Sequence, residues 1–136
     1  MNLTFLTNKK VYLASPYSHP FEPVKEQRFL QAAKYAGELH RRGIIFFSPI
    51  CHSHPIAEAG EFDGTFGSWE LLDYAFIDWA DVIIVLGLEG WEKSVGIRHE
   101  IIYAFPRKVY LWKPQYRPEH LDSLTIDGEN YIIHEG

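Results

Sequence analysis

The feature that most constrains the fold is the apolar run DVIIVL at residues 81–86, which has segments of helical spacing on both sides. Such a run indicates a buried strand. Three more short apolar runs occur at residues 10–15 (KVYLAS), 44–49 (IIFFSP) and 108–112 (KVYLW). Strands therefore alternate with helices along the chain, which predicts right-handed crossovers and a parallel sheet between layers of helix.

The expected helices have recognisable starts and stops. The first begins near Pro23 and ends before Gly43, the second opens on Ser68 as its N-cap, and the third runs from about 95 to 105. Residues 50–67 lack a clear period and are expected to form a long functional loop or lid. The tail, with TIDGENYII, is expected to contain a hairpin at residues 127–128.

These elements predict one α/β domain over residues 1–136, a flavodoxin-like or Rossmann-like three-layer sandwich with a parallel sheet of about four or five strands. Its 136 residues suffice for one ordinary core, and a hydrophobic content of 46% argues against disorder.

Charge and composition argue against several classes of partner and several cellular locations. A formal charge of -5 argues against a nucleic-acid polymer, and no apolar run approaches the about 20 residues of a membrane span. Cys51 is the single cysteine, and the first ten residues lack the apolar core of a signal peptide. We therefore expect a cytoplasmic protein without disulfides or membrane contact.

The carboxyl ends of parallel strands form one edge, where ligands bind in open α/β sheets. Here that edge carries residues 15–19, 48–54 and 87–94, while the P-loop lysine pattern and the GxGxxG turn are absent. Glu100 follows within a helix whose first turn, Ser94 to Gly96, offers free backbone donors to an anion. Asp73 adjoins the buried face of the preceding helix. Two carboxyl groups are the minimal equipment for breaking a glycosidic bond.

Three stretches, VYLASPY, DYAFIDWAD and SVGIRHEIIYA, together resemble the nucleoside 2-deoxyribosyltransferase superfamily, most closely an uncharacterised branch of it. The resemblance covers about residues 11–111. It implies cleavage or transfer of the N-glycosidic bond of a nucleoside or nucleoside 5′-monophosphate. The roles it implies are a nucleophile at Glu100, a proton carrier at Asp73 and a tyrosine at Tyr12 that holds the carboxylate.

Ser94 stands where the transferases tend to have an aspartate and where the related nucleoside monophosphate N-hydrolases have a serine directed at the 5′-phosphate. This similarity favours a monophosphate and hydrolysis. Ile102 and Pro16 depart from the pattern, since the relatives have a glycine and a phosphate-binding serine there. Arg98, Ser15 and Ser18 are expected to take over the phosphate contacts.

The remaining expectations concern substrate contacts, charge and assembly. No cofactor and no metal is expected, and relatives by resemblance are oligomers, so a homo-oligomer is predicted. The positive end of its helix is expected to keep Glu100 ionised, whereas apolar surroundings favour a protonated Asp73. The predicted substrate-binding residues are Ser15, Tyr17, Ser18, His52, His54, Trp69, Ser94, Gly96 and Arg98.

Two other functions remain open at this point. The same pocket would serve a binding module that senses a nucleotide without turning it over. A metal-assisted hydrolase is the other alternative, because His52 and His54 share a short segment and His19 follows a neighbouring strand. Three convergent histidines would favour that alternative.

Overall fold

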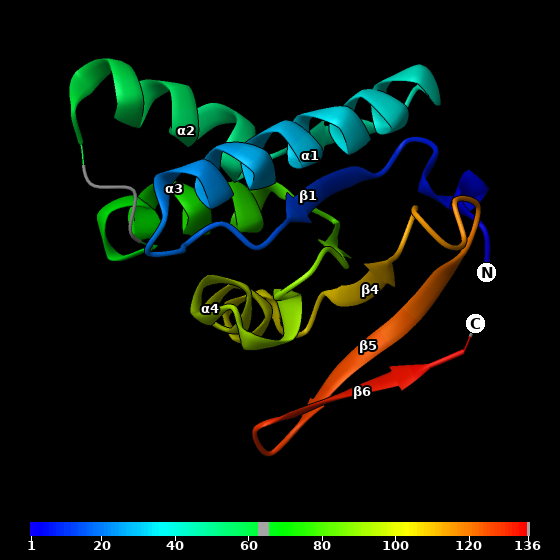
Figure 1. Ribbon diagram of the computed structural model, residues 1–136. Coiled ribbons are helices and arrows are strands. Elements are labelled where there is room, and N and C mark those ends of the chain that lie inside the picture. The colour runs from blue at the N-terminus through cyan, green and yellow to red at the C-terminus, as the bar shows by residue number, and fades with distance from the viewer. Residues whose placement is uncertain (63–65, 136) are drawn as a thin grey trace.

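A single six-stranded sheet organises the computed structural model, which describes residues 1–62 and 66–135. Figure 1 shows its strands and helices. The strands are β1 (Lys10–Ala14), β2 (Ile45–Phe47), β3 (Val82–Leu86), β4 (Lys108–Trp112), β5 (Leu121–Asp127) and β6 (Asn130–His134). The helices are α1 (Glu22–Arg41), α2 (Pro49–Gly60), α3 (Phe66–Trp79) and α4 (Val95–Ala104), with 3-10 turns at Leu3–Leu6 and Trp91–Lys93.

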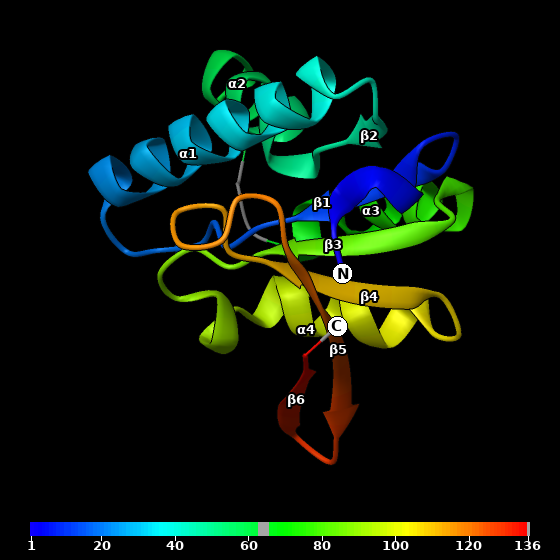
Figure 2. The same cartoon turned by 90° about the vertical axis from the view of Figure 1, so that its right-hand side faces the viewer.

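The strand order is β2-β1-β3-β4-β5-β6, and β1 to β4 are parallel. The prediction of an α/β fold is therefore confirmed, but a wholly parallel sheet is not, because β5 and β6 pair antiparallel. The expected hairpin is the cause. Gly128 adopts a left-handed φ of 61° in its turn, so the chain reverses there without a crossover helix. Figure 2 shows this hairpin extending away from α1 and α2.

Each buried strand presents alternate residues to two different layers of helix. On β1, Val11 and Leu13 pack with Leu39 of α1, while Tyr12 and Ala14 share a cluster with Ile77 of α3 and with α4. This separation explains why VIIVL (Val82–Leu86) is apolar at every position, since both of its faces are covered.

The segment predicted to be a loop or lid is largely helix α2. Ser48 caps it by accepting the N–H of Cys51 at 3.2 Å, and Pro49 occupies the first position, where a missing N–H costs nothing. Glu61 ends it in the left-handed region, with a φ of 57°. Residues 63–65 of that predicted loop lie outside the described residues.

Helix α3 begins at Phe66, so Ser68 lies in its first turn and is not its N-cap. Asp73 and Ile77 are buried positions one turn apart on this helix, and Ala80 directly after it is buried as well. Asp73 is therefore on the buried face itself. No helix among the described residues has the length and apolar character needed to cross a membrane.

Candidate active site

A cleft of about 650 Å³ opens at the carboxyl ends of β1 and β3, between α3 and the start of α4. Eight of the residues predicted for the site line it: Ser15, Tyr17, Ser18, Trp69, Asp73, Ser94, Gly96 and Glu100. They come from segments far apart in the sequence. The parallel topology brings these segments to one edge of the sheet, as the strand ends predict.

Tyr12 and Glu100 form the innermost pair. The Tyr12 hydroxyl donates a hydrogen bond to Oε2 of Glu100, and the two side chains are 0% and 4% exposed. Tyr12 is beneath the cleft wall because it points from β1 toward α3 and α4. Its hydroxyl thus supports the Glu100 carboxyl group from behind, while Glu100 itself faces the cleft.

Both carboxyl groups hold their protons more tightly than usual. Burial, then the nearby charge of Asp73, raises the pKa of Glu100 to about 8, although the Tyr12 hydrogen bond opposes the rise. Burial alone raises the pKa of Asp73 to about 7. Two close carboxyl groups in a desolvated site titrate as a coupled pair, so near neutral pH the pair holds roughly one proton.

The expected difference between the two acids is therefore not found in the free protein. The helix terminus was expected to keep Glu100 ionised and the surroundings of Asp73 to favour its acid form. Glu100 lies beyond the first turn of α4 and is buried, so desolvation outweighs the helix dipole, which acts mainly within that turn. The Tyr12 donor is the feature that favours an ionised Glu100.

Two buried polar atoms at the cleft lack a hydrogen-bond partner within the described part of the chain: Ser15 Oγ and Asp73 Oδ1. Ser15 is 5% exposed and Asp73 is 6% exposed. Buried polar groups are nearly always satisfied in folded proteins, so unpaired ones in a cleft point to a ligand that supplies the missing partner.

A tight turn brings the start of α4 to the cleft. Gly90 adopts a φ of 89°, which favours glycine, and a Cβ atom there would meet Arg28 Nη2 at 2.6 Å and displace the end of that side chain. Ser94 then caps α4 by accepting the N–H of Ile97 at 3.2 Å. The free N–H groups of the first turn and the positive end of the helix dipole lie beside Gly96 at the cleft.

Comparison with known families assigns most of the chain to one domain family. Residues 9–117 match the family model described as a domain of unknown function (DUF1937). The chain belongs to this family. No curated protein matches it.

The DUF1937 region includes Tyr12, Asp73 and Glu100, and it ends before the hairpin of β5 and β6. It also supplies cleft residues that the sequence did not predict, among them Arg28, Glu70, Lys93 and His99. Arg28 comes from the polar face of α1 and donates to the Ser18 carbonyl at 2.8 Å. Polar residues on exposed helix faces and short turns carry no distinctive pattern, so no motif marked these positions.

Three residues of the DUF1937 region that were predicted to bind substrate lie outside the cleft. Arg98 donates to the Glu129 carbonyl and covers the ring of Tyr131, so the hairpin occupies it. His52 is exposed and packs beside Phe47. His54 is buried behind Tyr17, to whose hydroxyl its Nδ1 is bonded at 2.5 Å.

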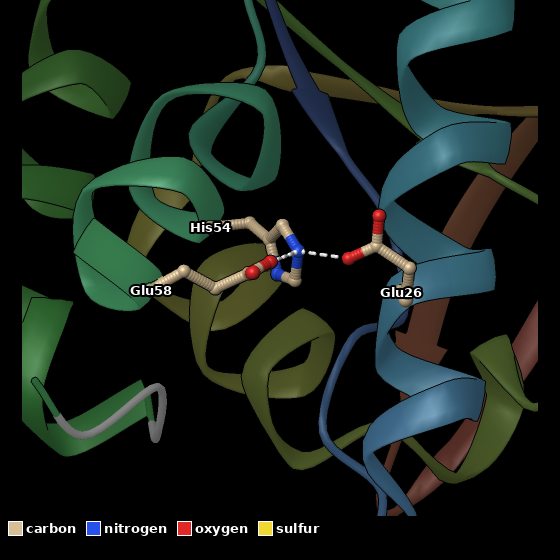
Figure 3. A group of neighbouring side chains, drawn as sticks. All are labelled: Glu26, His54 and Glu58. Atoms are coloured by element: carbon tan, nitrogen blue, oxygen red, sulfur yellow. Dashed lines mark hydrogen bonds and ion pairs between the residues drawn. The ribbon is translucent and has the colours of Figure 1, made fainter. Parts of the chain in front are cut away.

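His19, His52 and His54 do not form a shared cluster among the described residues. Among the described residues, the one group with the spacing of metal ligands consists of Glu26, His54 and Glu58. Figure 3 shows the ring of His54 between the two carboxylates. The three histidines that would have favoured a metal-assisted hydrolase are therefore not assembled.

Proposed function

We propose that this protein cleaves or transfers the N-glycosidic bond of a nucleoside or nucleoside 5′-monophosphate. The observation that carries the proposal is the pair of buried carboxyl groups, Asp73 and Glu100, which face one cleft and hold roughly one proton between them near neutral pH. A nucleophile and an acid are the two groups that such a reaction needs.

In the proposed reaction, a Glu100 oxygen attacks the anomeric carbon while the bond to the base breaks. Asp73 donates its proton to the leaving base. Positive charge that develops at the anomeric carbon favours an ionised Glu100, so substrate binding moves the shared proton toward Asp73. Water, or a second base in the transfer reaction, then attacks the sugar ester, and Asp73 takes the proton of that nucleophile. Tyr12 holds the carboxylate in line.

A 5′-phosphate has donors available in the same cleft. Arg28 and Lys93 line it together with the first turn of α4. Two cationic side chains beside a helix N-terminus form an environment suited to phosphate. This arrangement supports a nucleoside monophosphate as the preferred substrate, and it replaces Arg98 as the expected basic contact.

The resemblance to the nucleoside 2-deoxyribosyltransferase superfamily supports the same proposal. Tyr12, Asp73 and Glu100 are the three positions that the resemblance singled out. Asp73 and Glu100 line this cleft, and Tyr12 donates a hydrogen bond to Glu100 from beneath its wall. The flavodoxin-like or Rossmann-like three-layer sandwich is part of the proposal. The covered parallel strands β1 to β4 are compatible with it.

The test is a panel of ribonucleosides, deoxyribonucleosides and their 5′-monophosphates, with free base measured by chromatography, in the presence and absence of a second base. Release of base supports the proposal, and the second base separates transfer from hydrolysis. Lys93→Ala is expected to raise KM for monophosphates more than for nucleosides, because the exposed ammonium contacts only the phosphate. Tight binding of a nucleotide without base release would favour the sensing module instead.

Self-association is a further part of the proposal. Leu71 of α3 and Ile102 of α4 are 88% and 60% exposed, and Phe105 after α4 is 82% exposed. Exposed apolar residues on adjoining elements are typical of surfaces that a partner covers. Sedimentation at micromolar concentration should show a homo-oligomer; a monomer would contradict this part.

A further inference from the structure

A second group of titratable side chains lies behind the cleft wall, between α1 and α2. His54 Nε2 is 2.7 Å from Glu26 Oε2 and forms a still closer contact with Glu58 Oε1. Glu26 comes from α1, whereas His54 and Glu58 are one turn apart on α2, so both carboxylates approach the same ring nitrogen from different helices (Figure 3).

This arrangement has more acceptors than protons. A histidine Nε2 carries at most one hydrogen, in either its neutral or its charged form. One carboxylate can accept that hydrogen with good geometry, and the second then faces the first across the same nitrogen. Like charges at this separation repel each other. Three lone-pair donors gathered within 4.8 Å of one another match the needs of a cation better than those of a single proton.

The ring of His54 is held in the orientation that a ligand needs. Its Nδ1 is bonded to the Tyr17 hydroxyl at 2.5 Å, and Phe29 stacks on the ring at 4.4 Å with an interplanar angle of 23°. The residue is 3% exposed. A hydrogen bond on the far nitrogen is the usual support of a metal-bound histidine, since it fixes both the tautomer and the ring plane.

We propose that Glu26, His54 and Glu58 bind a divalent transition-metal ion of the zinc type. One nitrogen and two carboxylate oxygens suit Zn²⁺, with water at the remaining position. The three ligand atoms lie within 4.8 Å of one another. Zinc ligands in a tetrahedron stand roughly 3.4 Å apart. The glutamates are 49% and 60% exposed, so small side-chain rotations reach that spacing.

The site is separate from the proposed chemistry and does not depend on it. No ligand of the ion lines the cleft, but Tyr17, which bonds to His54, does. A bound ion links α1 to α2 and fixes the orientation of Tyr17 in the cleft wall. Its expected role is therefore to stabilise the helix pair that supports one side of the cleft.

The experiment is a titration of the tag-free, chelator-treated protein with Zn²⁺ by calorimetry and with Co²⁺ by visible absorption. Glu26→Gln and Glu58→Gln remove one ligand each from partly exposed positions. Glu22→Gln is the matched control, because Glu22 lies one turn from Glu26 on α1 and is 78% exposed. His52→Asn controls for adventitious binding to an exposed histidine on α2.

The wild type should bind one equivalent and melt several degrees higher with Zn²⁺. Each ligand variant should lose affinity by about tenfold or more, while Glu22→Gln and His52→Asn should behave like the wild type. Melting without metal shows that the variants are folded. No stoichiometric binding by the wild type, equal binding by the ligand variants and Glu22→Gln, or loss in His52→Asn alone would overturn the proposal.

Discussion

The two faces of the sheet bury side chains of different kinds. Toward α1, the strands and the helix bury apolar residues, such as Val11, Leu13 and Leu39. Toward α3 and α4, the same strand β1 presents Tyr12, and the helices add Asp73 and Glu100 among their apolar residues. The first face follows the ordinary composition of a core, in which acids are almost never fully buried.

Under the proposed function, this difference separates a face that supports the fold from a face that carries the proposed chemistry. Burying two carboxyl groups costs free energy because each must stay protonated or remain charged in a desolvated place. Strongly shifted acids in a cleft are typical of functional sites. The face toward α1 supports the fold, whereas the face toward α3 and α4 is less stable than an apolar core of the same size would be.

Glu100→Gln should have the largest effect on activity. The substitution preserves shape and removes the proposed nucleophile, so base release from a substrate of the wild type should fall by at least about 10³-fold. Substrate binding, measured by calorimetry, should survive. Glu70→Gln makes the same chemical change at another cleft position on α3 and should cost far less. An active Glu100→Gln protein would remove the functional distinction between the faces.

Two core variants, one on each face of the sheet, compare the effects of the two faces on the free energy of unfolding and on kcat. Leu39→Ala and Ile77→Ala each empty a fully buried site and should lower the free energy of unfolding by about 2–5 kcal/mol in urea titrations. Leu39→Ala should leave kcat per folded molecule unchanged. Ile77→Ala should also lower kcat, because Ile77 lies one turn after Asp73 on α3. Equal kcat in both variants would contradict the distinction.

The pH dependence of stability sharpens the same comparison. Asp73 and Glu100 have raised pKa values in the folded protein, about 7 and about 8, so the folded state binds more protons than the unfolded state above about pH 4. The stability that the protonated acids provide is complete below pH 4 and is lost as pH rises through 8. Wild type should lose roughly a few kcal/mol more over that range than the Asp73→Asn, Glu100→Gln double variant. An equal loss of stability in the wild type and in the double variant over this pH range would show that the pKa values of the two acids are not raised.

Ser15→Ala should have the smallest effect. Its hydroxyl lacks a partner among the described residues, so removal should leave the free energy of unfolding within about 1 kcal/mol of the wild type. Affinity for the ligand should fall by up to about tenfold, because the Ser15 hydroxyl is expected to form a hydrogen bond with a group of the bound ligand. Unchanged affinity would show that Ser15 does not contact the ligand.

The sequence predicts the sheet and its edge better than it predicts the cleft lining. Apolar runs identify β1 to β4. In β1, β3 and β4 the run is continuous because strands covered on both faces do not alternate with polar residues. Helix α2 was missed because its histidines and the internal Pro55 obscure the period, although Ser48 and Pro49 form a recognisable N-cap and first position. Arg28 could not be predicted, since tertiary packing alone brings α1 to the cleft. Lys93 lies in the segment 87–94 that was predicted to form the edge, but no motif singled it out.

The ionisation of the site also lay beyond the sequence. The position of Glu100 behind a helix N-terminus suggested an ionised group, whereas its pKa depends on burial and on the distance to Asp73, both of which arise from packing. Arg98 shows the same limit. It lies on the predicted helix, but its guanidinium group donates to the Glu129 carbonyl in the hairpin of β5 and β6.

The central claim, that Glu100 is the nucleophile, is tested most directly by trapping the sugar on the protein. Wild type is mixed with a nucleoside or nucleotide that it turns over, quenched in acid and digested with trypsin, which releases residues 99–107 between Arg98 and Arg107. Mass spectrometry should show that peptide heavier by one glycosyl group, with no such species in Glu100→Gln. A glycosyl group on any other peptide, or full turnover by Glu100→Gln, would contradict the account.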